Sequence, residues 1–372
     1  MGNIVFVNQS ASHPTKDIIN AFAEKFQNVV LIAGSISKTG NPLNKNVTIK
    51  RIIKYDRKTI FRRTITWTLA TLQTIFLLNI KFRNYHLFLT SNPPLLTFVP
   101  LFCKNKYSVQ ILDIYPDALV SNGFITADSW ISKIWTKCNR RLFSRALNIF
   151  TLTEGMANTL SKYCNRDKIK VISQWPSFSK FDKVERSRNE FIISNNLQNN
   201  FIIMYSGNIG LGHHVDVLVE IADKLKNHKD ILLIIIGEGW NKTHIERLVQ
   251  KHKLQNCRLL PYQPEGMFRH SIQAADIGVV GVSKKVASLA VPIKTYNLIM
   301  NEVPLLCITE GNSELTSLVN KFDIGKCFSP NQINEMVEYI LKLRKESAVI
   351  MRYKANLREC ANYFSPENAY LY

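Results

Sequence analysis

The strongest pattern for binding chemistry is a glycine-rich segment, MYSGNIGLGHH, at residues 204–214. Gly207, Gly210 and Gly212 follow a short apolar run and precede an amphipathic segment. Glycines allow a backbone to approach a ligand closely, and the free N–H groups at the start of a helix attract anions. The segment therefore predicts a strand, a turn and a helix that hold a pyrophosphate. A tight turn without a ligand is the alternative.

A second pair of glycines and a lysine could complete the same site. Gly237 and Gly239 flank Glu238 directly after the apolar run 231–236. Ligands of open parallel sheets bind at the carboxyl edge, so two consecutive turns of this kind indicate one crevice. Lys294 is expected in the first turn of a later helix, where the dipole disfavours a cation unless an anion lies between them. The alternative for Lys294 is an ordinary surface lysine.

Short apolar runs alternate with amphipathic helices along the chain, which is typical of parallel α/β sheets. The polar stretch 179–200 interrupts the alternation and is interpreted as a linker. We therefore expect two α/β domains that face each other across a cleft. Their strands are expected at 4–8, 29–32, 86–90, 108–113, 149–153 and 169–173 in the first domain, and at 201–206, 231–236, 257–260, 277–282 and 304–308 in the second.

The formal net charge of the 372 residues is +20, and most of the excess belongs to the first half. Residues 1–178 contain 24 Lys and Arg against 8 Asp and Glu, whereas residues 179–372 contain 24 against 20. A cationic half attracts phosphates, nucleic acid or an anionic membrane leaflet. Since there is no zinc-finger spacing and no RNP-type aromatic motif, nucleic acid is not expected as a partner. The basic stretch 50–63 favours an anionic membrane surface, with a solvated face as the alternative.

Cysteines and apolar segments indicate the compartment. Seven scattered cysteines without a Cys-x-x-Cys pair favour reduced thiols in a cytoplasmic protein over disulfides or a zinc site. The first residues, MGNIVFVNQS, lack a basic region followed by a long apolar run, so we expect a strand there rather than a signal peptide. Residues 64–80 lack charge but include five threonines and a glutamine, which favours a buried or interfacial helix over a transmembrane one.

Ordered landmarks along nearly the whole chain resemble glycosyltransferase family 4, in particular the bacterial branch that builds O-antigen, capsule and exopolysaccharide repeat units. In the first half the landmarks are TSNPP (90–94), LDIYPD (112–117), TEGM (153–156) and ISQWP (172–176). In the second half they are SGNIG (206–210), GEG (237–239), PYQ (261–263), AADIGVV (274–280), VPIKTY (291–296), VPLL (303–306) and DIG (323–325). The resemblance implies a GT-B fold with Rossmann-like domains at 1–178 and 201–352, the linker at 179–200, and a crossover helix at 353–372 that packs on the N-terminal domain.

For the second half, the resemblance implies a site for a nucleotide-sugar donor. The glycine loop would face the diphosphate, with Asn208 and His213 where the family usually has Arg and Lys, so Lys294 would be the main cation. The family's Glu-x7-Glu pair falls at Leu289 and Asn297, where the amide can still bond ribose hydroxyls. The other expected donor contacts are Gly207, Gly210, Gly212, Gly237, Glu238, Gly239, Tyr262, Pro292 and Tyr296.

For the first half, the resemblance implies the acceptor side. Asp113 would leave the carboxyl end of a strand, where it could orient the acceptor hydroxyl or stabilise positive charge at the anomeric carbon. His13 is the rival candidate for this role. A loop-capping aspartate and an ordinary loop histidine are the alternatives. The other residues expected on the acceptor side are Ser10, Ser91, Asn92, Tyr115 and Asp117.

The expected activity is sugar transfer without a metal ion or another cofactor. No Asp-x-Asp motif is apparent, so backbone N–H groups, a helix end and Lys294 would stabilise the leaving diphosphate. The resemblance further implies retention of the anomeric configuration and a UDP-linked donor. The acceptor would be a polyprenyl-linked saccharide or another glycolipid at the inner face of the plasma membrane, where the chain would be peripheral. A nucleotide-sugar 2-epimerase with GT-B architecture and a degenerate, non-catalytic binding subunit are the alternatives.

Overall fold

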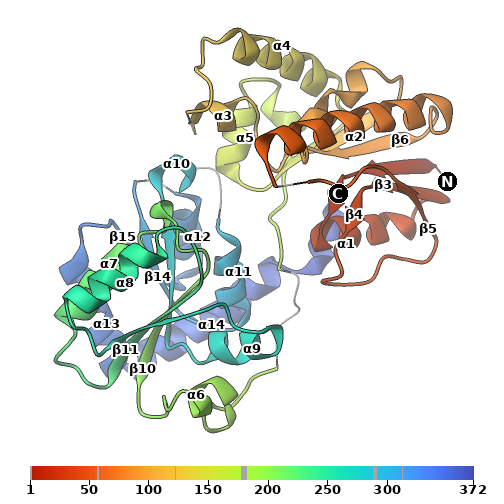
Figure 1. The fold of residues 1–372 in the computed structure, drawn as a ribbon. Coiled ribbons are helices and arrows are strands. Elements are labelled where there is room, and N and C mark those ends of the chain that lie inside the picture. The colour runs from red at the N-terminus through yellow and green to blue at the C-terminus, as the bar shows by residue number, and fades with distance from the viewer. Residues whose placement is uncertain (1, 57, 122, 177–181, 288–290, 312) are drawn as a thin grey trace. The chain divides into compact units, whose positions relative to one another are not determined.

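The computed structural model describes residues 2–56, 58–121, 123–176, 182–287, 291–311 and 313–372 (Figure 1). The chain divides into two compact units. The first unit consists of Met1–Ser177 together with Pro366–Tyr372, and the second consists of Phe178–Ser365. Each unit has its own parallel sheet and its own hydrophobic core.

The first unit is built on a seven-stranded parallel sheet in the order β5-β3-β1-β6-β7-β8-β9. Its strands are β1 (Asn3–Val7), β3 (Asn28–Ala33), β5 (Val47–Arg51), β6 (His86–Thr90), β7 (Tyr107–Gln110), β8 (Ile149–Thr151) and β9 (Ile169–Val171). The helical segments are α1 (His13–Ala23), α2 (Ile60–Ile80), η1 (Pro94–Leu101), α3 (Asp117–Ser121), α4 (Trp130–Arg145), α5 (Glu154–Leu160) and η2 (Arg166–Lys168). A separate short pair joins β2 (Ser10–Ala11) to β4 (Ser35–Ile36).

The second unit is built on a six-stranded parallel sheet in the order β12-β11-β10-β13-β14-β15. Its strands are β10 (Phe201–Ser206), β11 (Ile231–Ile236), β12 (Cys257–Leu260), β13 (Ile277–Val282), β14 (Leu305–Thr309) and β15 (Gly325–Phe328). The helical segments are η3 (Arg186–Arg188), α6 (Glu190–Ser194), η4 (Leu211–His213), α7 (Val215–Lys224), α8 (Lys242–Lys251), α9 (Glu265–Gln273), α10 (Lys284–Ala287), α11 (Ile293–Met300), α12 (Glu314–Phe322), α13 (Ile333–Lys345) and α14 (Ser347–Tyr363).

Strand β11 shows why the second sheet is covered on both faces. All of its residues, ILLIII, are buried. Side chains alternate between the faces of a strand, and Leu232, Ile234 and Ile236 belong to one core cluster while Leu233 and Ile235 belong to another. Each such side chain contributes about 1.5–3 kcal/mol on burial, so β11 anchors the sheet that carries the turns described below.

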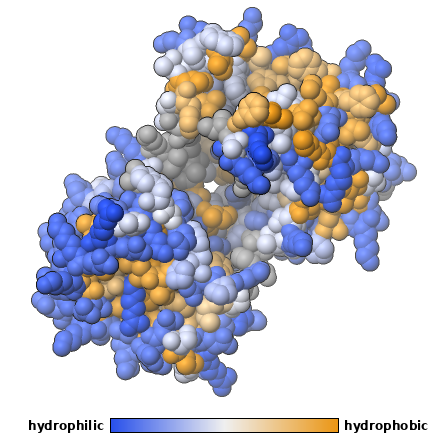
Figure 2. All heavy atoms as spheres, in the orientation of Figure 1, coloured by the Kyte–Doolittle hydropathy of each residue, from blue (hydrophilic) through white to orange (hydrophobic). Residues whose placement is uncertain are grey.

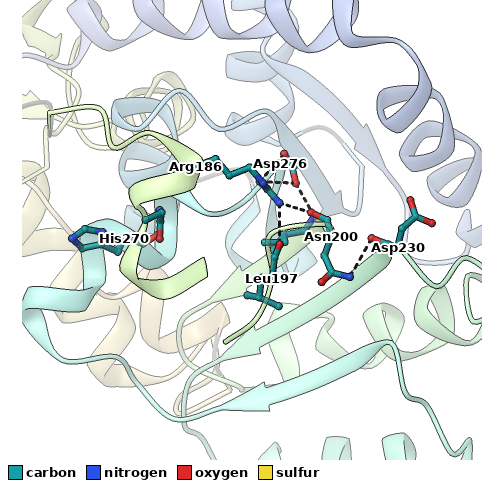
Figure 3. A network of polar contacts seen from close by, with 8 residues as sticks. Arg186, Leu197, Asn200, Asp230, His270 and Asp276 are labelled. Atoms are coloured by element: carbon teal, nitrogen blue, oxygen red, sulfur yellow. Dashed lines mark hydrogen bonds and ion pairs between the residues drawn. The ribbon is translucent and has the colours of Figure 1, made fainter. Parts of the chain in front are cut away.

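The described part of the predicted linker is folded onto the second unit (Figure 3). The guanidinium of Arg186 lies 3.5 Å from the Asp276 carboxylate and also donates to the carbonyl of Asn200. The same carboxylate accepts the amide of Ile202 at 2.8 Å, at the start of the sheet. The side chain of Asn189 caps α6 and donates to the carbonyl of His270. Residues 182–200 are therefore part of the second unit rather than a free connector.

The structure differs from the predicted elements in two further places. Strands β2, β4, β5 and β15 were not predicted. Strands β2 and β4 have only two residues each, and β5 and β15 lie at the edges of their sheets with a single buried residue, Val47 or Phe328. The predicted crossover at 353–372 also needs correction. Helix α14 packs its buried residues, including Leu357, into the core of the second unit, and only Pro366–Tyr372 belongs to the first unit, where it packs on α1.

The segment predicted at 64–80 forms the longer helix α2. Of the helices in the described part of the chain, none combines the length and the apolar character needed to cross a bilayer.

Candidate functional site

The carboxyl ends of β10 and β11 continue into two turns that are hydrogen-bonded to each other. The amide of Gly207 donates to the carbonyl of Ile236 at 2.9 Å. The amide of Ile209 donates to the carbonyl of Glu238 at 2.8 Å. The structure therefore brings the two predicted glycine turns together at one edge of the sheet.

Glycine is needed at Gly237 because the neighbouring turn leaves no room for a side chain. A Cβ atom on Gly237 would lie 1.9 Å from the carbonyl oxygen of Gly207, and the φ angle of 152° also favours glycine. Gly239 is similarly crowded, since its Cβ would lie 2.3 Å from the carbonyl oxygen of Ile209. The two turns thus pack backbone against backbone.

Lys294, the second residue of α11, reaches the same turns. Its Nζ lies 3.9 Å from the centroid of the Tyr205 ring and 3.0 Å from the position that a Cβ on Gly207 would take. This Nζ is buried and has no hydrogen-bond partner among the residues that the structure describes. Burial lowers the pKa of Lys294 to about 7. An amine held in this way would be stabilised by an anion placed on the turns.

A cavity of about 30 Å³ lies beside the amine of Lys294. It is lined by Met204, Ser206, Phe268, Ile272, Val279, Lys294, Asn297 and Leu298. A space of this size holds about one water molecule and not a nucleotide. A diphosphate would therefore have to bind on the turns outside this cavity.

The two positions at which the family usually carries cations hold weaker groups here. Nδ1 of His213 lies 3.4 Å from the carbonyl oxygen of Gly281, and burial together with the charge of Lys294 lowers the pKa of His213. Asn208 is exposed, and its carbonyl accepts a hydrogen bond from the Tyr205 hydroxyl at 2.6 Å. Neither residue supplies a permanent positive charge, which leaves Lys294 as the cation of these turns within the described residues.

The remaining glycines of the loop have somewhat more room than Gly237. A Cβ on Gly210 would lie 3.2 Å from the side-chain amide of Asn208, and one on Gly212 would lie 3.2 Å from Ser283. The Asn208 side chain can rotate away from such a contact, whereas the Cβ of Ser283 is fixed to its backbone. Gly210 and Gly212 therefore avoid crowding with neighbouring side chains, and they are not required by close packing against another backbone segment.

Helix α11 presents only some of its predicted residues to the site. Pro292 precedes the helix, and Asn297 lines the same cavity as Lys294. Tyr296 instead lies in the core with its ring centroid 4.8 Å from that of Phe364, because two residues along a helix turn the side chain to the opposite side. The prediction that Tyr296 contacts the donor is corrected accordingly. Leu289 lies outside the described residues.

Aromatic side chains are exposed where β11 and β12 end. Tyr262, which was predicted, is 52% exposed, and Trp240, which was not, is 72% exposed. Glu238 forms an ion pair with Lys242 at 2.8 Å. Tyr205 was not predicted either, although its place two residues before Gly207 on β10 could have indicated it. Exposed rings at a strand edge can stack on a planar ligand.

In the first unit, Ser91 and Asp113 are joined at the ends of β6 and β7. The hydroxyl oxygen of Ser91 accepts the amides of Leu112 and Asp113 at 2.8 and 3.2 Å. The Asp113 side chain keeps contact with solvent, but the surrounding residues remove part of its hydration and raise its pKa. Ser91 therefore positions the backbone from which a solvent-accessible carboxylate projects.

The other residues of this segment serve the packing of the first unit. Tyr115 stacks on Trp135 with centroids 5.7 Å apart, and burial next to Asp113 raises the pKa of Tyr115 to about 12. Asp117 accepts the hydroxyl hydrogen of Tyr163 and pairs with Lys162 at 3.2 Å. These contacts hold the Asp117 carboxylate in place, and its role on the acceptor side stays a prediction. The carbonyl of Asn92 accepts a hydrogen bond from Thr90 at 3.3 Å.

His13 is held at the start of α1. Its Nε2 lies 2.9 Å from the carbonyl oxygen of Trp175, and the indole of Trp175 donates to Asp17 at 2.9 Å. A carbonyl can only accept, so Nε2 carries the hydrogen and Nδ1 keeps its lone pair. Burial lowers the pKa of His13, which favours this neutral form. The neighbouring Ser10 accepts a hydrogen bond from Ser35 at 3.2 Å.

Of the described residues, no group of three or more His, Cys, Asp and Glu side chains is arranged to hold a metal ion. The arrangement in the second unit instead offers glycine backbone, the start of α7 and a buried amine to an anion. The arrangement in the first unit offers a carboxylate with a raised pKa. Taken separately, the second unit could bind an anion and the first could orient a hydroxyl.

Residues 187–360 match the model of the family described as "Glycosyl transferases group 1". The chain is 24% identical over 257 residues to the putative colanic acid biosynthesis glycosyl transferase WcaI of Escherichia coli K12, covering 66% of this chain and 62% of that protein. It is 23% identical over 231 residues to the probable glycosyltransferase WbjE of Pseudomonas aeruginosa, covering 61% and 56%. The matches thus span less than two thirds of either relative.

The fold is also found among solved structures. The Anabaena protein Alr3699/HepE in complex with UDP superposes with a TM-score of 0.72 over 99% of this chain and 97% of that one, at 9% identity. A second structure of that protein contains UDP-glucose and gives a TM-score of 0.70. The predicted GT-B fold is therefore confirmed, although family 4 itself is not named by the matches. The chain is a GT-B protein whose second unit carries the group 1 glycosyltransferase match and whose relatives include a putative glycosyltransferase of colanic acid biosynthesis.

Proposed function

We propose that the protein is a glycosyltransferase that moves a sugar from a nucleotide-sugar donor to an acceptor in bacterial surface polysaccharide biosynthesis. The observation that carries the proposal is the junction of the two glycine turns with the buried, unpaired amine of Lys294. Nucleotide sugars carry a diphosphate, and an enzyme that cleaves them must stabilise the negative charge that develops on it. The site supplies a cation and helix N-terminal N–H groups for that purpose.

A UDP-linked sugar is the proposed donor. The proposal is supported by the UDP and UDP-glucose complexes of the Anabaena protein, which shares the fold. Exposed Tyr262 and Trp240 are available to border the base. Transfer without a metal ion and with retention of configuration are parts of the same proposal. The first is supported by the amine and backbone donors that can take over charge stabilisation.

A polyprenyl-linked saccharide or another glycolipid is the proposed acceptor, met at the inner face of the plasma membrane. The colanic acid assignment of one relative supports a polysaccharide pathway. Asp113 is the proposed group at the acceptor hydroxyl, because it projects from a strand end and its raised pKa makes it a better proton acceptor than an ordinary aspartate. His13 is the second candidate, through its free Nδ1.

Ligand-dependent stabilisation tests the donor site directly. Thermal unfolding of the full chain is measured with UDP, GDP, dTDP, UDP-glucose and UDP-N-acetylglucosamine. We expect UDP and one UDP-sugar to raise the melting temperature. Lys294→Ala should weaken UDP binding about 10-fold to 100-fold, since it removes a charge-assisted contact. Lys229→Ala is the matched control, because Lys229 is exposed and lies away from the turns.

Three outcomes would contradict the proposal. If no nucleoside diphosphate stabilises the chain, the glycine turns are structural. If a donor is bound and its sugar changes configuration without any acceptor, the protein is an epimerase of the same architecture. Donor binding without turnover on any polyprenyl-linked or glycolipid acceptor would indicate a non-catalytic subunit, a reading favoured by Asn297 in place of a glutamate.

A further inference from the structure

Helix α2 has two apolar faces, of which only one is covered by the first unit. The covered face includes Thr66, Ala70, Thr74 and Leu78, which follow each other at intervals of four residues. Six large apolar residues of the same helix are between 40% and 74% exposed: Phe61, Ile65, Leu69, Leu72, Phe76 and Ile80. A surface helix normally turns polar residues to water, so a second apolar face requires its own explanation.

The exposed residues form one continuous stripe, which we call the α2 stripe. At about 100° per residue, positions 61, 65, 69, 72, 76 and 80 fall within a sector of about 100° on the helix. The middle of this sector lies roughly opposite the buried positions 66, 70, 74 and 78. Figure 2 shows orange, hydrophobic side chains gathered over the position of α2. The stripe is therefore an ordered surface along the whole helix rather than scattered exposure.

The polar side chains of α2 are compatible with an apolar medium. The hydroxyls of Thr66, Thr68, Thr71 and Thr74 each donate to the carbonyl four residues earlier, at 2.8–2.9 Å. These bonds satisfy the hydroxyl hydrogens within the helix, as apolar surroundings require. The threonines that made this segment a poor transmembrane candidate are therefore no obstacle to burial at an interface.

Positive charge lies at both ends of the α2 stripe. Lys58 and Arg62 are exposed at its start, and Lys81 and Arg83 are exposed just after its end. Helix α2 contains no acidic residue. Its Asn79 side chain donates to the carbonyl of Phe102. Phe102 is also exposed, as is Lys104 two residues later. An apolar strip about 31 Å long, bordered by cations, matches an anionic lipid surface in both polarity and charge.

We propose that the α2 stripe docks the protein on an anionic lipid bilayer, with α2 lying in the plane of the interface and its exposed apolar residues among the acyl chains. The proposal deepens the proposed function, because it names the surface by which a transferase of lipid-linked acceptors would reach the membrane. A second copy of the chain is a less suitable occupant. In a two-fold interface the antiparallel stripes would place the basic ends of one copy close to those of the other.

Vesicle co-sedimentation of the full chain tests the proposal. The vesicles contain equal parts of phosphatidylglycerol and phosphatidylethanolamine, with pure phosphatidylcholine vesicles for comparison. We expect binding to the anionic vesicles, and a loss of at least about tenfold in affinity for the triple variant Leu72→Ser, Phe76→Ser, Ile80→Ser. The matched control is Ile193→Ser with Met351→Ser, which removes exposed apolar residues from the second unit and should bind like the wild type.

Two further measurements separate docking from its alternatives. Unchanged thermal unfolding and UDP binding of the triple variant would show that its fold and donor site are intact, so a loss of vesicle binding would be specific to the stripe. Light scattering after gel filtration gives the oligomeric state. The proposal is overturned if the triple variant binds vesicles as well as the wild type. It is also overturned if the wild type is a dimer that ignores vesicles and the variant is a monomer. Vesicle binding and light scattering are measured without acceptor or donor, so these two results are independent of transferase activity.

Discussion

The strand ends of the two units offer different chemistry on similar parallel sheets. In the second unit, the ends of β10 and β11 present backbone, with glycines packed against each other and one unpaired amine behind them. In the first unit, the ends of β6 and β7 present side chains, most of which are already engaged, as Ser91 and Asp117 are. Backbone N–H groups suit a multiply charged anion, whereas a positioned carboxylate suits a single hydroxyl. Under the proposed function, the second unit would therefore hold the leaving group and the first unit would orient the acceptor.

The largest expected effect comes from replacing the carboxylates of the first unit with amides. Asp113→Asn keeps the shape but removes the base, so turnover with a lipid-linked acceptor should fall about 100-fold to 10,000-fold while UDP affinity stays unchanged. Asp117→Asn should instead reduce the free energy of unfolding by about 1–3 kcal/mol, because it disturbs the contacts with Tyr163 and Lys162. Calorimetry and UDP-release assays distinguish the two. Equal losses of turnover in both variants would argue against a special role for Asp113.

A pair of glycine substitutions tests the backbone character of the second unit. Gly237→Ala places a methyl group 1.9 Å from the Gly207 carbonyl oxygen. We therefore expect the free energy of unfolding to fall by about 2–4 kcal/mol and UDP binding to be lost. Gly123→Ala in the first unit is the control, since it also has a positive φ of 76° but meets nothing within 4 Å. It should cost about 1–2 kcal/mol and leave UDP binding intact. Denaturant unfolding gives both numbers, and a tolerated Gly237→Ala would contradict the close packing.

The pH dependence of UDP binding tests whether Lys294 contacts the diphosphate in its charged form. Burial lowers the pKa of the free amine to about 7, and a bound diphosphate favours the protonated form and so raises the pKa. The affinity is therefore fully developed below pH 7 and should fall by up to about tenfold per unit as the pH rises above 7. Lys294→Arg should flatten the profile, because a guanidinium stays charged. Titration calorimetry between pH 7 and 9 measures this, and a wild-type affinity that rises with pH would exclude the ion contact.

The local parts of this comparison were predictable from the sequence, and the long-range parts were not. The turns after β10 and β11 follow from glycines placed directly after apolar runs, and β11 follows from its continuous apolar stretch. The Tyr205–Lys294 contact depends on how a strand and a helix far apart in the chain pack together. Tyr296 was assigned to the donor from its landmark, but the turn of α11 directs it into the core. The hydrogen bond from Tyr163 to Asp117 likewise joins residues 46 positions apart, so the residues around Asp117 do not indicate it.

Helix α2 lies between these cases. Its apolar composition predicted a buried or interfacial helix, which leaves open whether one face or two would be covered. Only the structure separates the buried positions from the exposed stripe, because neither set contains a charged residue and both recur about every four residues.

The ion pair between Arg186 and Asp276 limits where the second unit can be separated from the rest of the chain. The pKa of Asp276 is raised because the residue is buried, and Arg186 is its ion-pair partner upstream of the sheet. A fragment that began at the first strand, Phe201, would leave this carboxylate without its guanidinium and would lack Phe191 and Ile192, which belong to the core. The smallest autonomous version of this half therefore has to start upstream of Arg186, well before the sheet itself begins.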